Sequence, residues 1–550
     1  MAAAAPSASS ATNRSGRTAG EQDTATASAS LVRPLAGKDF SRGGDRCIEA
    51  LPTHRRREQP DKGRTFLNAT VYRSALNISA ICGMYLAVAM LLPTSVDLYY
   101  GHKDWKVFAL SAVLVGGLSV LTAVATRAGP PPFSKKMGFL LVNVLWLAFS
   151  IIGAIPFMLS SLEMGFAKAL FESVSAITTT GSTVIAGLDH APPGILIWRS
   201  LLHWLGGIGI VALGLFVMPY LRVGGISFFK MESSDTNDKP FARIASFTRA
   251  FILVYVLITL ACAITFAALG MSRFDAINHA MATVATGGFS THDASFGYFN
   301  SLPLLWAATF FMTVCSLPFS ILIVFMVRGR LDALRDPQIG VFLAYLVAFS
   351  IAIAVYHRLQ NGVPFHAALA HSFFTVSTIL STTGFASEDY TLWGPFVVTM
   401  AFFMTFMGGC SGSTAGGIKA YRFIILFNSI RTGLYKLIYP DGIHAVRYGK
   451  MTVDADLQRN VILFFTTYLL LWAVGSLAMA AMGYDVLTST SAVITALSNV
   501  GPGVGPIVGP AGNFSTISDP ALYLLSLMML LGRLEVLTVL VVLTPRFWRS

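Results

Sequence analysis

Four short turns of Thr, Ser and Gly carry the residues of this sequence that are best suited to binding an ion. They read Thr178–Thr183, Val284–Ser290, Ser381–Phe385 and Ser498–Gly503, and a glycine in each allows the four to be aligned. Backbone carbonyl oxygens and Thr hydroxyls can replace the hydration shell of a monovalent cation, and glycine permits the dihedral angles that aim carbonyls at one point. The pattern predicts a cation selectivity filter formed by Thr179, Thr180, Gly181, Ala285, Thr286, Gly287, Thr382, Thr383, Gly384, Asn499, Val500 and Gly501.

Each turn follows a short amphiphilic segment that we expect to be a helix. The segments are Phe166–Ile177, Phe274–Val284, Pro364–Thr378 and Asp485–Leu497, all too short to cross about 30 Å of hydrocarbon. Non-helical backbone at membrane depth is tolerated only where protein buries it or water reaches it, and the partly negative C-terminal end of each helix favours a cation. A single such turn is more often a helix cap, but four in the same register favour a filter.

The fourth turn differs from the other three. It has Asn499 and Val500 where the others carry Thr at one or both positions. We therefore expect pseudo-fourfold rather than fourfold symmetry, and the coordination of an ion at this turn stays open.

A run of glycines interrupts the apolar segment 393–427. It contains Gly408, Gly409, Gly412, Gly416 and Gly417. Each glycine disfavours a helix interior by about 1 kcal/mol relative to Ala. Close packing between helices would explain spaced small residues, whereas a dense run with Ser and Thr between favours an intramembrane loop under the filter.

Two basic residues lie where a charge could control this path. Lys419 follows the glycine run, and its position fits equally a side chain that reaches the interface and one that lines the ion path. Arg533 lies in the last apolar segment, two residues before Glu535. We predict that Arg533 lies in the pore near the glycine run and impedes cations when the gate is closed. The histidines of the apolar segments are interpreted as packing or interfacial residues rather than proton carriers: His203, His279, His366 and His371.

Composition places these residues in a membrane. Hydrophobic residues make up 54% of the chain and charged residues 12%, against about a quarter charged in soluble domains. Apolar stretches long enough to span a bilayer are expected near 72–95, 107–127, 137–160, 198–220, 248–270, 302–327, 338–357, 393–427, 458–482 and 520–544.

The charged residues indicate topology. The net charge of +12 does not indicate nucleic-acid binding, because the basic residues lie in short loops between apolar segments. Their alternation with acidic loops puts both termini in the cytoplasm. The five cysteines form no CxxC motif, so neither a metal site nor a disulfide framework is expected.

The expected fold is an all-α integral membrane protein. Two N-terminal helices are followed by four repeats of helix, pore helix and helix (M1-P-M2) in a pseudo-fourfold arrangement around one pore. Residues 1–65 are expected to be a disordered cytoplasmic extension, and residues 66–130 the two additional transmembrane helices. The repeats follow in order, the third with the gate loop: 131–222, 240–330, 336–430 and 455–550.

The motifs around the turns extend in order along most of the chain. They are Ile177–Thr183, Trp198-Arg199, His203–Gly209, Ala285–Thr291, Ser381–Phe385, Gly408–Lys419, Leu497–Gly503 and Leu531–Glu535. In these motifs the chain resembles the Trk/Ktr/HKT superfamily of potassium transporters, and most closely its Trk-type membrane subunits. The two spans before the first repeat favour the Trk branch over the shorter Ktr type.

The resemblance implies a homodimer in the bacterial inner membrane, each protomer with its own pore. It also implies a TrkA-type cytosolic regulatory subunit that binds NAD or other nucleotides, and a gate formed by the glycine run. A serine at the position of Gly181 is associated with sodium preference in the HKT branch, so Gly181 favours potassium. The chain has no Walker A or Rossmann fingerprint, so a nucleotide would act through the partner. No cofactor is expected, and K⁺ is the transported ion.

The predicted function is a gated potassium uptake pore. The alternative is a potassium symporter coupled to Na⁺ or H⁺. It ranks lower because coupling usually places acidic residues in the membrane, and none is evident at the depth of the filter. A membrane-embedded enzyme is not expected, since the apolar segments contain no HExxH, DxD or Ser-Lys pattern.

Overall fold

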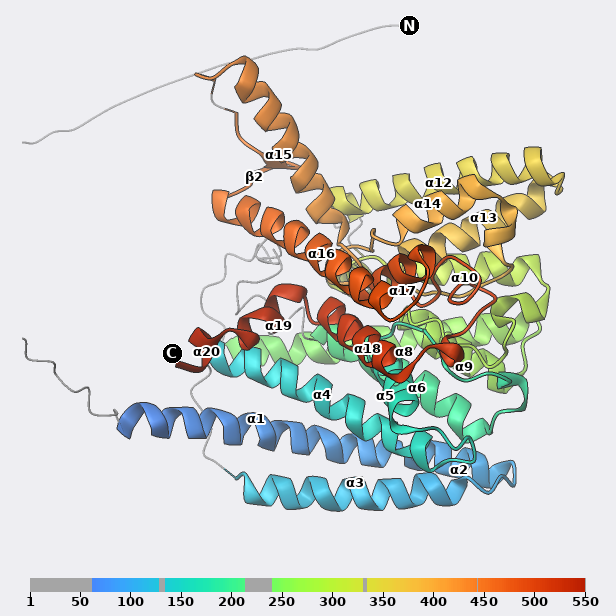
Figure 1. The fold of residues 1–550 in the computed structure, drawn as a ribbon, viewed down its shortest axis with the longest axis vertical. Helices are drawn as coiled ribbons and strands as arrows, with labels where there is room; N and C mark the ends of the chain where they lie inside the picture. The colour runs from blue at the N-terminus through green and yellow to red at the C-terminus, as the bar shows by residue number, and fades with distance from the viewer. Residues whose placement is uncertain (1–61, 128–133, 213–239, 330–333, 443, 550) are drawn as a thin grey trace, which may run out of the picture. The chain divides into compact units, whose positions relative to one another are not determined.

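Helices make up almost all of the structure, a computed structural model that describes residues 62–127, 134–212, 240–329, 334–442 and 444–549 (Figure 1). These residues belong to one compact unit, Asp61–Ser550. The strands in this part of the chain are β1 (Arg447–Tyr448) and β2 (Met451–Thr452), which form one antiparallel pair. The predicted all-α fold is confirmed.

Seven helical segments of the described residues are long and apolar enough to cross a membrane. The first consists of α1 (Lys62–Ala89) and α2 (Leu91–Tyr99) together. The others are α3 (Trp105–Ala125), α4 (Lys135–Leu159), α6 (Pro193–Ala212), α8 (Pro240–Ala268), α12 (Pro337–Asn361) and α16 (Ala455–Ala481). The chain is therefore a multi-pass membrane protein.

Two segments predicted as single spans are bent. In 302–327, α10 (Leu302–Cys315) meets α11 (Phe319–Arg328) at 100°, and in 520–544, α18 (Asp519–Arg533) meets α19 (Val536–Leu543) at 111°. Pro318 at the first bend lacks the donor of a helical hydrogen bond. Glu535 at the second has a left-handed backbone, with φ 62°. If each bent pair counts as one span, the described residues have nine. They correspond to nine of the ten predicted segments, and the tenth, 393–427, is not one continuous helix.

Four short helices precede the four turns. They are α5 (Phe166–Ile177), α9 (Arg273–Val284), α13 (Phe365–Leu380) and α17 (Val486–Ser498). The predicted segment 393–427 is divided into α14 (Pro395–Met404) and α15 (Ala420–Ile438). The remaining elements are α20 (Pro545–Arg549) and the 3₁₀ helices η1 (Leu188–His190), η4 (Ser295–Phe299), η6 (Tyr390–Trp393) and η7 (Phe514–Thr516).

Each short helix lies between two helices of its own group. α5 packs on α4 and α6, α9 on α8 and α10, α13 on α12 and α14, and α17 on α16 and α18. Between groups, α9 contacts α6, α13 contacts α10, α16 contacts α15, and α5 contacts α18. The last contact joins the first group to the fourth, so the order of neighbours returns to its start. Helices α1 and α3 lie side by side next to α4 (Figure 1).

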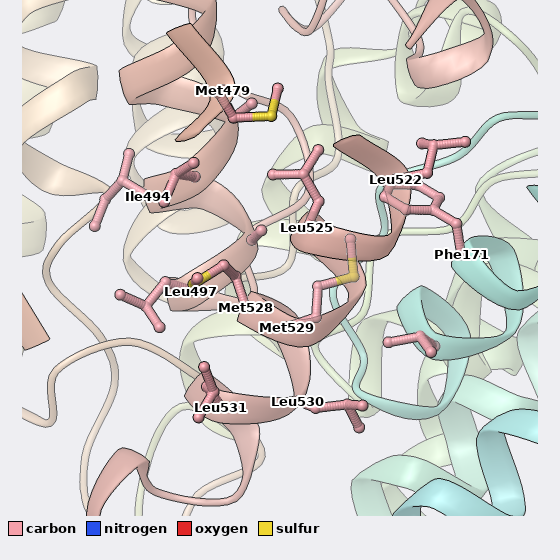
Figure 2. Close-up of a cluster of buried hydrophobic side chains, with 14 of the residues drawn as sticks. Phe171, Met479, Ile494, Leu497, Leu522, Leu525, Met528, Met529, Leu530 and Leu531 are labelled. Atoms are coloured by element: carbon pink, nitrogen blue, oxygen red, sulfur yellow. The ribbon is translucent and has the colours of Figure 1, made fainter. Parts of the chain in front are cut away.

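Apolar side chains fix the fourth short helix in place. Figure 2 shows Ile494 and Leu497 of α17 in one buried cluster with Met479 of α16 and with Leu525 and Met528 of α18. Because lipid is as apolar as these side chains, such contacts stabilise the protein through close packing rather than through the exclusion of water. The cluster thus determines where the C-terminal end of α17 meets the fourth turn.

Parts of the predicted domains fall outside the described residues. The extension predicted for residues 1–65 lies outside them up to residue 61, and residues 62–65 already belong to α1. The segments 128–133, 213–239 and 330–333 also lie outside them. The domain boundaries therefore stay predictions.

Candidate functional site

The four turns share an unusual backbone conformation directly after their helices. The first residue with this conformation is left-handed in every turn, with φ 52° at Thr179, 51° at Thr286, 56° at Thr382 and 56° at Asn499. Left-handed backbone is rare for a β-branched residue such as Thr, so its recurrence in three turns identifies equivalent positions. Asn adopts this conformation more readily than Thr, which explains why the fourth turn can differ in sequence and keep the same shape.

A left-handed glycine follows two residues later in each turn. These glycines are Gly181 (φ 87°), Gly288 (φ 79°), Gly384 (φ 83°) and Gly501 (φ 104°). The predicted alignment used Gly287 in the second turn, and this register is wrong by one residue, because Gly287 is not left-handed. Ala285 accordingly lies one position before the predicted filter. The correct register could have been found from the Gly-Phe pair that the second and third turns share, which begins at Gly288 and Gly384.

Close backbone contacts link each turn to the next. A Cβ atom built on each of these glycines would lie 1.8–2.7 Å from a carbonyl oxygen of another turn. The pairs are Gly181 with Gly287 (2.2 Å), Gly288 with Thr383 (1.8 Å), Gly384 with Val500 (2.0 Å) and Gly501 with Thr180 (2.7 Å). The fourth turn returns to the first, so the contacts close into what we call the four-turn ring, residues 178–182, 285–289, 381–385 and 498–502. Its carbonyls come from one equivalent position of each turn.

Side-chain hydrogen bonds support the ring from outside. Thr180 Oγ1 lies 2.7 Å from Thr178 Oγ1 and accepts from Asn499 Nδ2 at 2.9 Å. The same Asn499 amide donates to the carbonyl of Met529 in α18 at 2.9 Å. The divergent residue of the fourth turn therefore ties that turn to the first turn and to a neighbouring helix.

A buried ion pair braces the first and second turns. Arg199 Nε of α6 lies 2.8 Å from Glu172 Oε1 of α5, and the two side chains are 1% and 0% exposed. Glu172 accepts hydrogen bonds from the backbone N–H of Val184 at 2.9 Å and from Thr183 Oγ1 at 3.0 Å. Arg199 also donates to the carbonyl of Ser290 at 3.0 Å.

This pair, with an acidic member at the depth of the short helices, was not predicted from the sequence. The signal was a Glu and an Arg inside otherwise apolar helices, which membranes rarely contain without a role. Because Arg199 compensates the charge of Glu172, this carboxylate does not favour the coupled-transport alternative.

The four histidines lie in different environments. His203 and His279 are fully buried, and the two ring nitrogens of His279 lie 2.9 Å from Ser290 Oγ and from the Asp275 carbonyl. His371 is half-buried beside Glu388, and His366 is exposed.

A hydrogen bond joins the loops that follow the first and second turns. His292 Nδ1 lies 2.5 Å from Asp189 Oδ1, and the His292 ring stacks on Tyr298. The hydrogen bond from His292 is the main cause that lowers the pKa of Asp189 below its usual value.

The residues between α14 and α15 form a non-helical segment, residues 405–419, which we call the glycine loop. Its backbone N–H groups at Gly416 and Gly417 donate to Thr382 Oγ1 at 2.6 Å and to the Ser498 carbonyl at 2.8 Å. Thr414 Oγ1 is within 3.1 Å of the Val284 carbonyl and 3.2 Å of the Cys315 carbonyl. The loop therefore lies directly against the second, third and fourth turns.

Close backbone contacts explain why this loop is rich in glycine. A Cβ atom on Gly408 would lie 2.1 Å from the Gly416 carbonyl oxygen, and one on Gly416 would lie 2.4 Å from that of Ser498. A Cβ atom on Gly409 would lie 2.7 Å from another side chain. Gly412 and Gly417 are left-handed, with φ 77° and 65°. These contacts belong to a folded loop rather than to packing between two continuous helices.

Arg533 lies at the bend between α18 and α19, beside the glycine loop. Its side chain is buried, and Nη1 donates to the Thr414 carbonyl at 3.0 Å. Nε and Nη2 have no hydrogen-bond partner among the described residues. Glu535 pairs with Arg422 instead, and Lys419 Nζ donates to the Ala415 carbonyl. A small cavity of about 50 Å³ is lined by the loop and by these three cationic side chains.

The described residues contain no group of three or more His, Cys, Asp or Glu side chains that could hold a metal ion. The cysteines that the structure describes are all free thiols: Cys82, Cys262, Cys315 and Cys410. Any ion held at the four-turn ring would therefore be held by uncharged oxygen atoms.

Comparisons with known proteins agree along nearly the whole described chain. A family model described as TrkH, a cation transport protein, matches residues 106–354 and 339–550. The chain is 39% identical over 476 residues to the Trk system potassium uptake protein TrkI of Halomonas elongata, which covers 86% of this chain and 96% of that protein. It is 32% identical over 488 residues to the Trk system potassium uptake protein TrkH of Escherichia coli K12, covering 87% and 100%.

A solved structure gives the same result for the fold. The crystal structure of the potassium transporter TrkH from Vibrio parahaemolyticus matches with a TM-score of 0.81 and 32% sequence identity, covering 87% of this chain and 100% of that one. The residues that the family model matches include the four-turn ring and the glycine loop. The chain belongs to the TrkH family of cation transport proteins.

Proposed function

We propose that this chain is the membrane subunit of a potassium uptake system and conducts K⁺ through the four-turn ring. The observation that carries the proposal is the closed sequence of contacts from Gly181 to Thr180 through all four turns. Four uncharged carbonyl groups from equivalent positions suit a monovalent cation that loses its hydration shell. The relatives described as potassium uptake proteins support K⁺ as that ion.

The filter in this proposal consists of three residues from each turn. With the corrected register of the second turn, they are Thr179, Thr180, Gly181, Thr286, Gly287, Gly288, Thr382, Thr383, Gly384, Asn499, Val500 and Gly501. The short helices end at these residues, so their partly negative C-terminal ends favour a cation there.

The gate in this proposal is the glycine loop together with Arg533. The loop lies against three turns and is held by separate hydrogen bonds. Arg533 adds a buried positive charge at the loop, and two unit charges 4 Å apart repel by about 4 kcal/mol at an effective dielectric constant of 20. Movement of the loop away from the turns, with Arg533, opens the path.

The remaining parts of the proposal concern the surroundings of the chain. The basic loops favour an inner membrane protein with both termini in the cytoplasm. The sequence lacks a nucleotide-binding fingerprint, and the relatives are described as members of a Trk system. Both facts favour a TrkA-type cytosolic regulatory subunit as the partner, and the homodimer enters this proposal from the family resemblance alone.

Ion flux into vesicles that contain the purified protein tests the proposal. We expect K⁺ and Rb⁺ to enter readily and Na⁺ and Li⁺ to enter slowly, because carbonyl groups of a potassium filter replace the hydration shell of K⁺ and of the similar Rb⁺. Vesicles without protein are the control. Equal rates for all four ions would contradict a potassium filter, and no flux of any ion in the presence of the regulatory subunit would contradict a pore.

A further inference from the structure

One position of the four-turn ring differs from its equivalents in side chain. The residue whose carbonyl meets the neighbouring glycine is Thr180, Thr383 or Val500 in three turns, and Gly287 in the second. All three alternatives are β-branched. The backbone at Gly287 is not left-handed, since its φ is not positive. Its conformation alone would therefore permit a side chain.

The imidazole of His203 occupies the space that this side chain would fill. A Cβ atom on Gly287 would lie 2.4 Å from His203 Nδ1, 2.6 Å from Cγ and 2.8 Å from Cε1. Real Cβ atoms do not approach other atoms so closely. The absence of a side chain at Gly287 and the presence of a ring at His203 are thus two parts of one packing arrangement.

The His203 ring is itself fixed on other sides. It stacks on Phe289 of the second turn, with 4.1 Å between ring centroids and 17° between planes. The Arg199 guanidinium lies 3.9 Å from the centroid of the same Phe289 ring. His203 is fully buried, and neither ring nitrogen has a hydrogen-bond partner among the described residues. The Ser175 backbone faces the imidazole without a hydrogen bond of ordinary geometry, so the effect of His203 on Gly287 comes from the packed shape of its ring.

Two glycines bring α6 close enough for this contact. A Cβ atom on Gly206 would lie 2.1 Å from the Ile177 carbonyl at the end of α5, and one on Gly207 would lie 3.0 Å from Ala285 Cα. α6 thus passes directly between the first and second turns. Because protein interiors are packed as densely as organic crystals, a displacement of α6 would move His203 and, through it, the four-turn ring.

We infer that His203 is a positioning residue of the ion filter, which replaces the missing side chain of Gly287 and holds its carbonyl group in the ring. This inference rests on the proposed function and adds a specificity-determining residue to it. It also gives a reason for the His-Trp-Leu-Gly-Gly motif that begins at His203.

A double-substitution cycle in the full-length protein tests the inference by Rb⁺ and Na⁺ flux in vesicles. His203→Ala should lower the Rb⁺/Na⁺ flux ratio about tenfold, equivalent to about 1.4 kcal/mol, because Gly287 loses its support. Gly287→Thr alone should lower it as much, because the new side chain meets the imidazole. The two substitutions together should restore the ratio to within about threefold of the parent, since the threonine side chain then fills the vacated space.

Gly288→Ala is the matched control. Gly288 is left-handed, and a Cβ atom there would meet the Thr383 carbonyl at 1.8 Å. His203→Ala cannot relieve that contact. Gly288→Ala should therefore lower the flux ratio equally with and without His203.

A second readout does not need flux. An ion that binds only the folded state raises its Tm, so the Tm in K⁺ minus the Tm in Na⁺ reports the filter in detergent. His203→Ala should reduce this difference and the double variant should restore it. If His203→Ala cannot be purified, recovery of folded protein in the double variant supports the inference, and failure of recovery opposes it.

Two results overturn the inference. One is an unchanged flux ratio and Tm difference in His203→Ala, and the other is a double variant no better than His203→Ala. If the parent protein itself does not distinguish K⁺ or Rb⁺ from Na⁺, the proposed function fails and takes this inference with it. If the parent distinguishes them and the two substitutions show no coupling, only the inference about His203 fails.

Discussion

The four-turn ring and the glycine loop are both buried, glycine-rich and non-helical, yet they are held in different ways. In the ring, a glycine such as Gly384 lies so close to a carbonyl of the next turn, that of Val500, that no side chain fits between them. The loop makes such close glycine contacts mainly within itself and meets the turns in this way at Gly416, whose Cβ would lie 2.4 Å from the Ser498 carbonyl oxygen. Elsewhere hydrogen bonds attach it to the turns. The Thr414 hydroxyl, for example, donates to the Val284 carbonyl.

This difference indicates which part is fixed and which can move. The ring contacts form a closed series, so one turn cannot shift without displacing the others in a densely packed interior. Hydrogen bonds of about 1 kcal/mol net each can be exchanged one at a time. We interpret the ring as the fixed part of the ion path and the loop as its movable part.

Gly384→Ser should break the ring and give the largest effect. Its φ of 83° is unfavourable for serine, and the new Cβ would lie 2.0 Å from the Val500 carbonyl oxygen. We expect the Rb⁺/Na⁺ flux ratio in vesicles to fall to about one, because the carbonyl ring no longer matches the ion. Gly340→Ala, which has no neighbouring atom within 4 Å of the added Cβ, is the control. Retained discrimination in Gly384→Ser would contradict the filter assignment.

Glu172→Gln should weaken the brace behind the ring. Arg199 would keep its buried charge without the counter-charge that lies 2.8 Å away, and breaking such a pair costs about 3–5 kcal/mol. Thermal unfolding in detergent measures this loss. Glu172→Gln combined with Arg199→Met removes both charges and should recover part of the stability. Exposed Asp456 offers a control, since Asp456→Asn should cost under about 1 kcal/mol.

Arg533→Ala should affect the loop and leave the ring intact. It removes a buried positive charge and the hydrogen bond to the Thr414 carbonyl. We expect K⁺ flux to rise about tenfold, corresponding to about 1.4 kcal/mol, with an unchanged Rb⁺/Na⁺ ratio. Arg533→Lys keeps the charge and should keep the flux low. Unchanged or lost flux at normal expression would argue against Arg533 as part of the gate.

Thr414→Val should produce a smaller effect of the same sign. The substitution preserves the shape of the side chain and removes its hydrogen bonds to the Val284 and Cys315 carbonyls. At about 1 kcal/mol net for such bonds, we expect the open fraction of the pore to rise about fivefold in single-channel records. Thr399→Val, which removes an exposed bond within α14, should change nothing. No increase in opening would mean that these bonds do not hold the loop closed.

Asp189→Asn should give the smallest effect, because it changes a partly exposed hydrogen bond to His292 and touches neither the four-turn ring nor the glycine loop. The hydrogen bond from His292 lowers the pKa of Asp189. The carboxylate therefore stabilises the folded state at pH values above the ordinary Asp pKa of about 3.9, and this stabilisation is lost as the pH falls below that value. We expect a loss below about 1 kcal/mol at neutral pH. The gap in Tm between variant and parent should close below about pH 4. A gap that widens on acidification would contradict this sign.

Local patterns made the short helices and turns predictable, but the register of the second turn was not. Clusters of Thr and Gly after a helical segment are visible in the sequence, and the four turns lie where they were expected. Gly287 and Gly288 are the same residue type, so only their backbone angles distinguish them. The backbone angles shift the predicted filter residues of the second turn by one position. Gly287 must be glycine for a different reason, because the imidazole of His203 occupies the space of a side chain there.

Partners far apart in the chain could not be predicted. The Glu172–Arg199 pair spans 27 residues, and the Arg422–Glu535 pair spans 113. The sequence displays each charge but not which opposite charge the fold brings to it. The bend at Glu535 could not be predicted either, because Leu534 and Glu535 between the two helices are neither Gly nor Pro. The pairing of Glu535 with Arg422 is visible only in the three-dimensional structure.

The contact that closes the four-turn ring has a consequence for how the protein is made. Asn499 donates to Thr180, which lies 319 residues earlier in the chain. Domains are synthesised from the N-terminus, so the first turn enters the membrane long before the fourth exists. A nascent chain that ends before α17 carries three turns and an open side where the fourth belongs. The last helices to be inserted therefore determine the moment at which the newly made protein becomes able to select an ion.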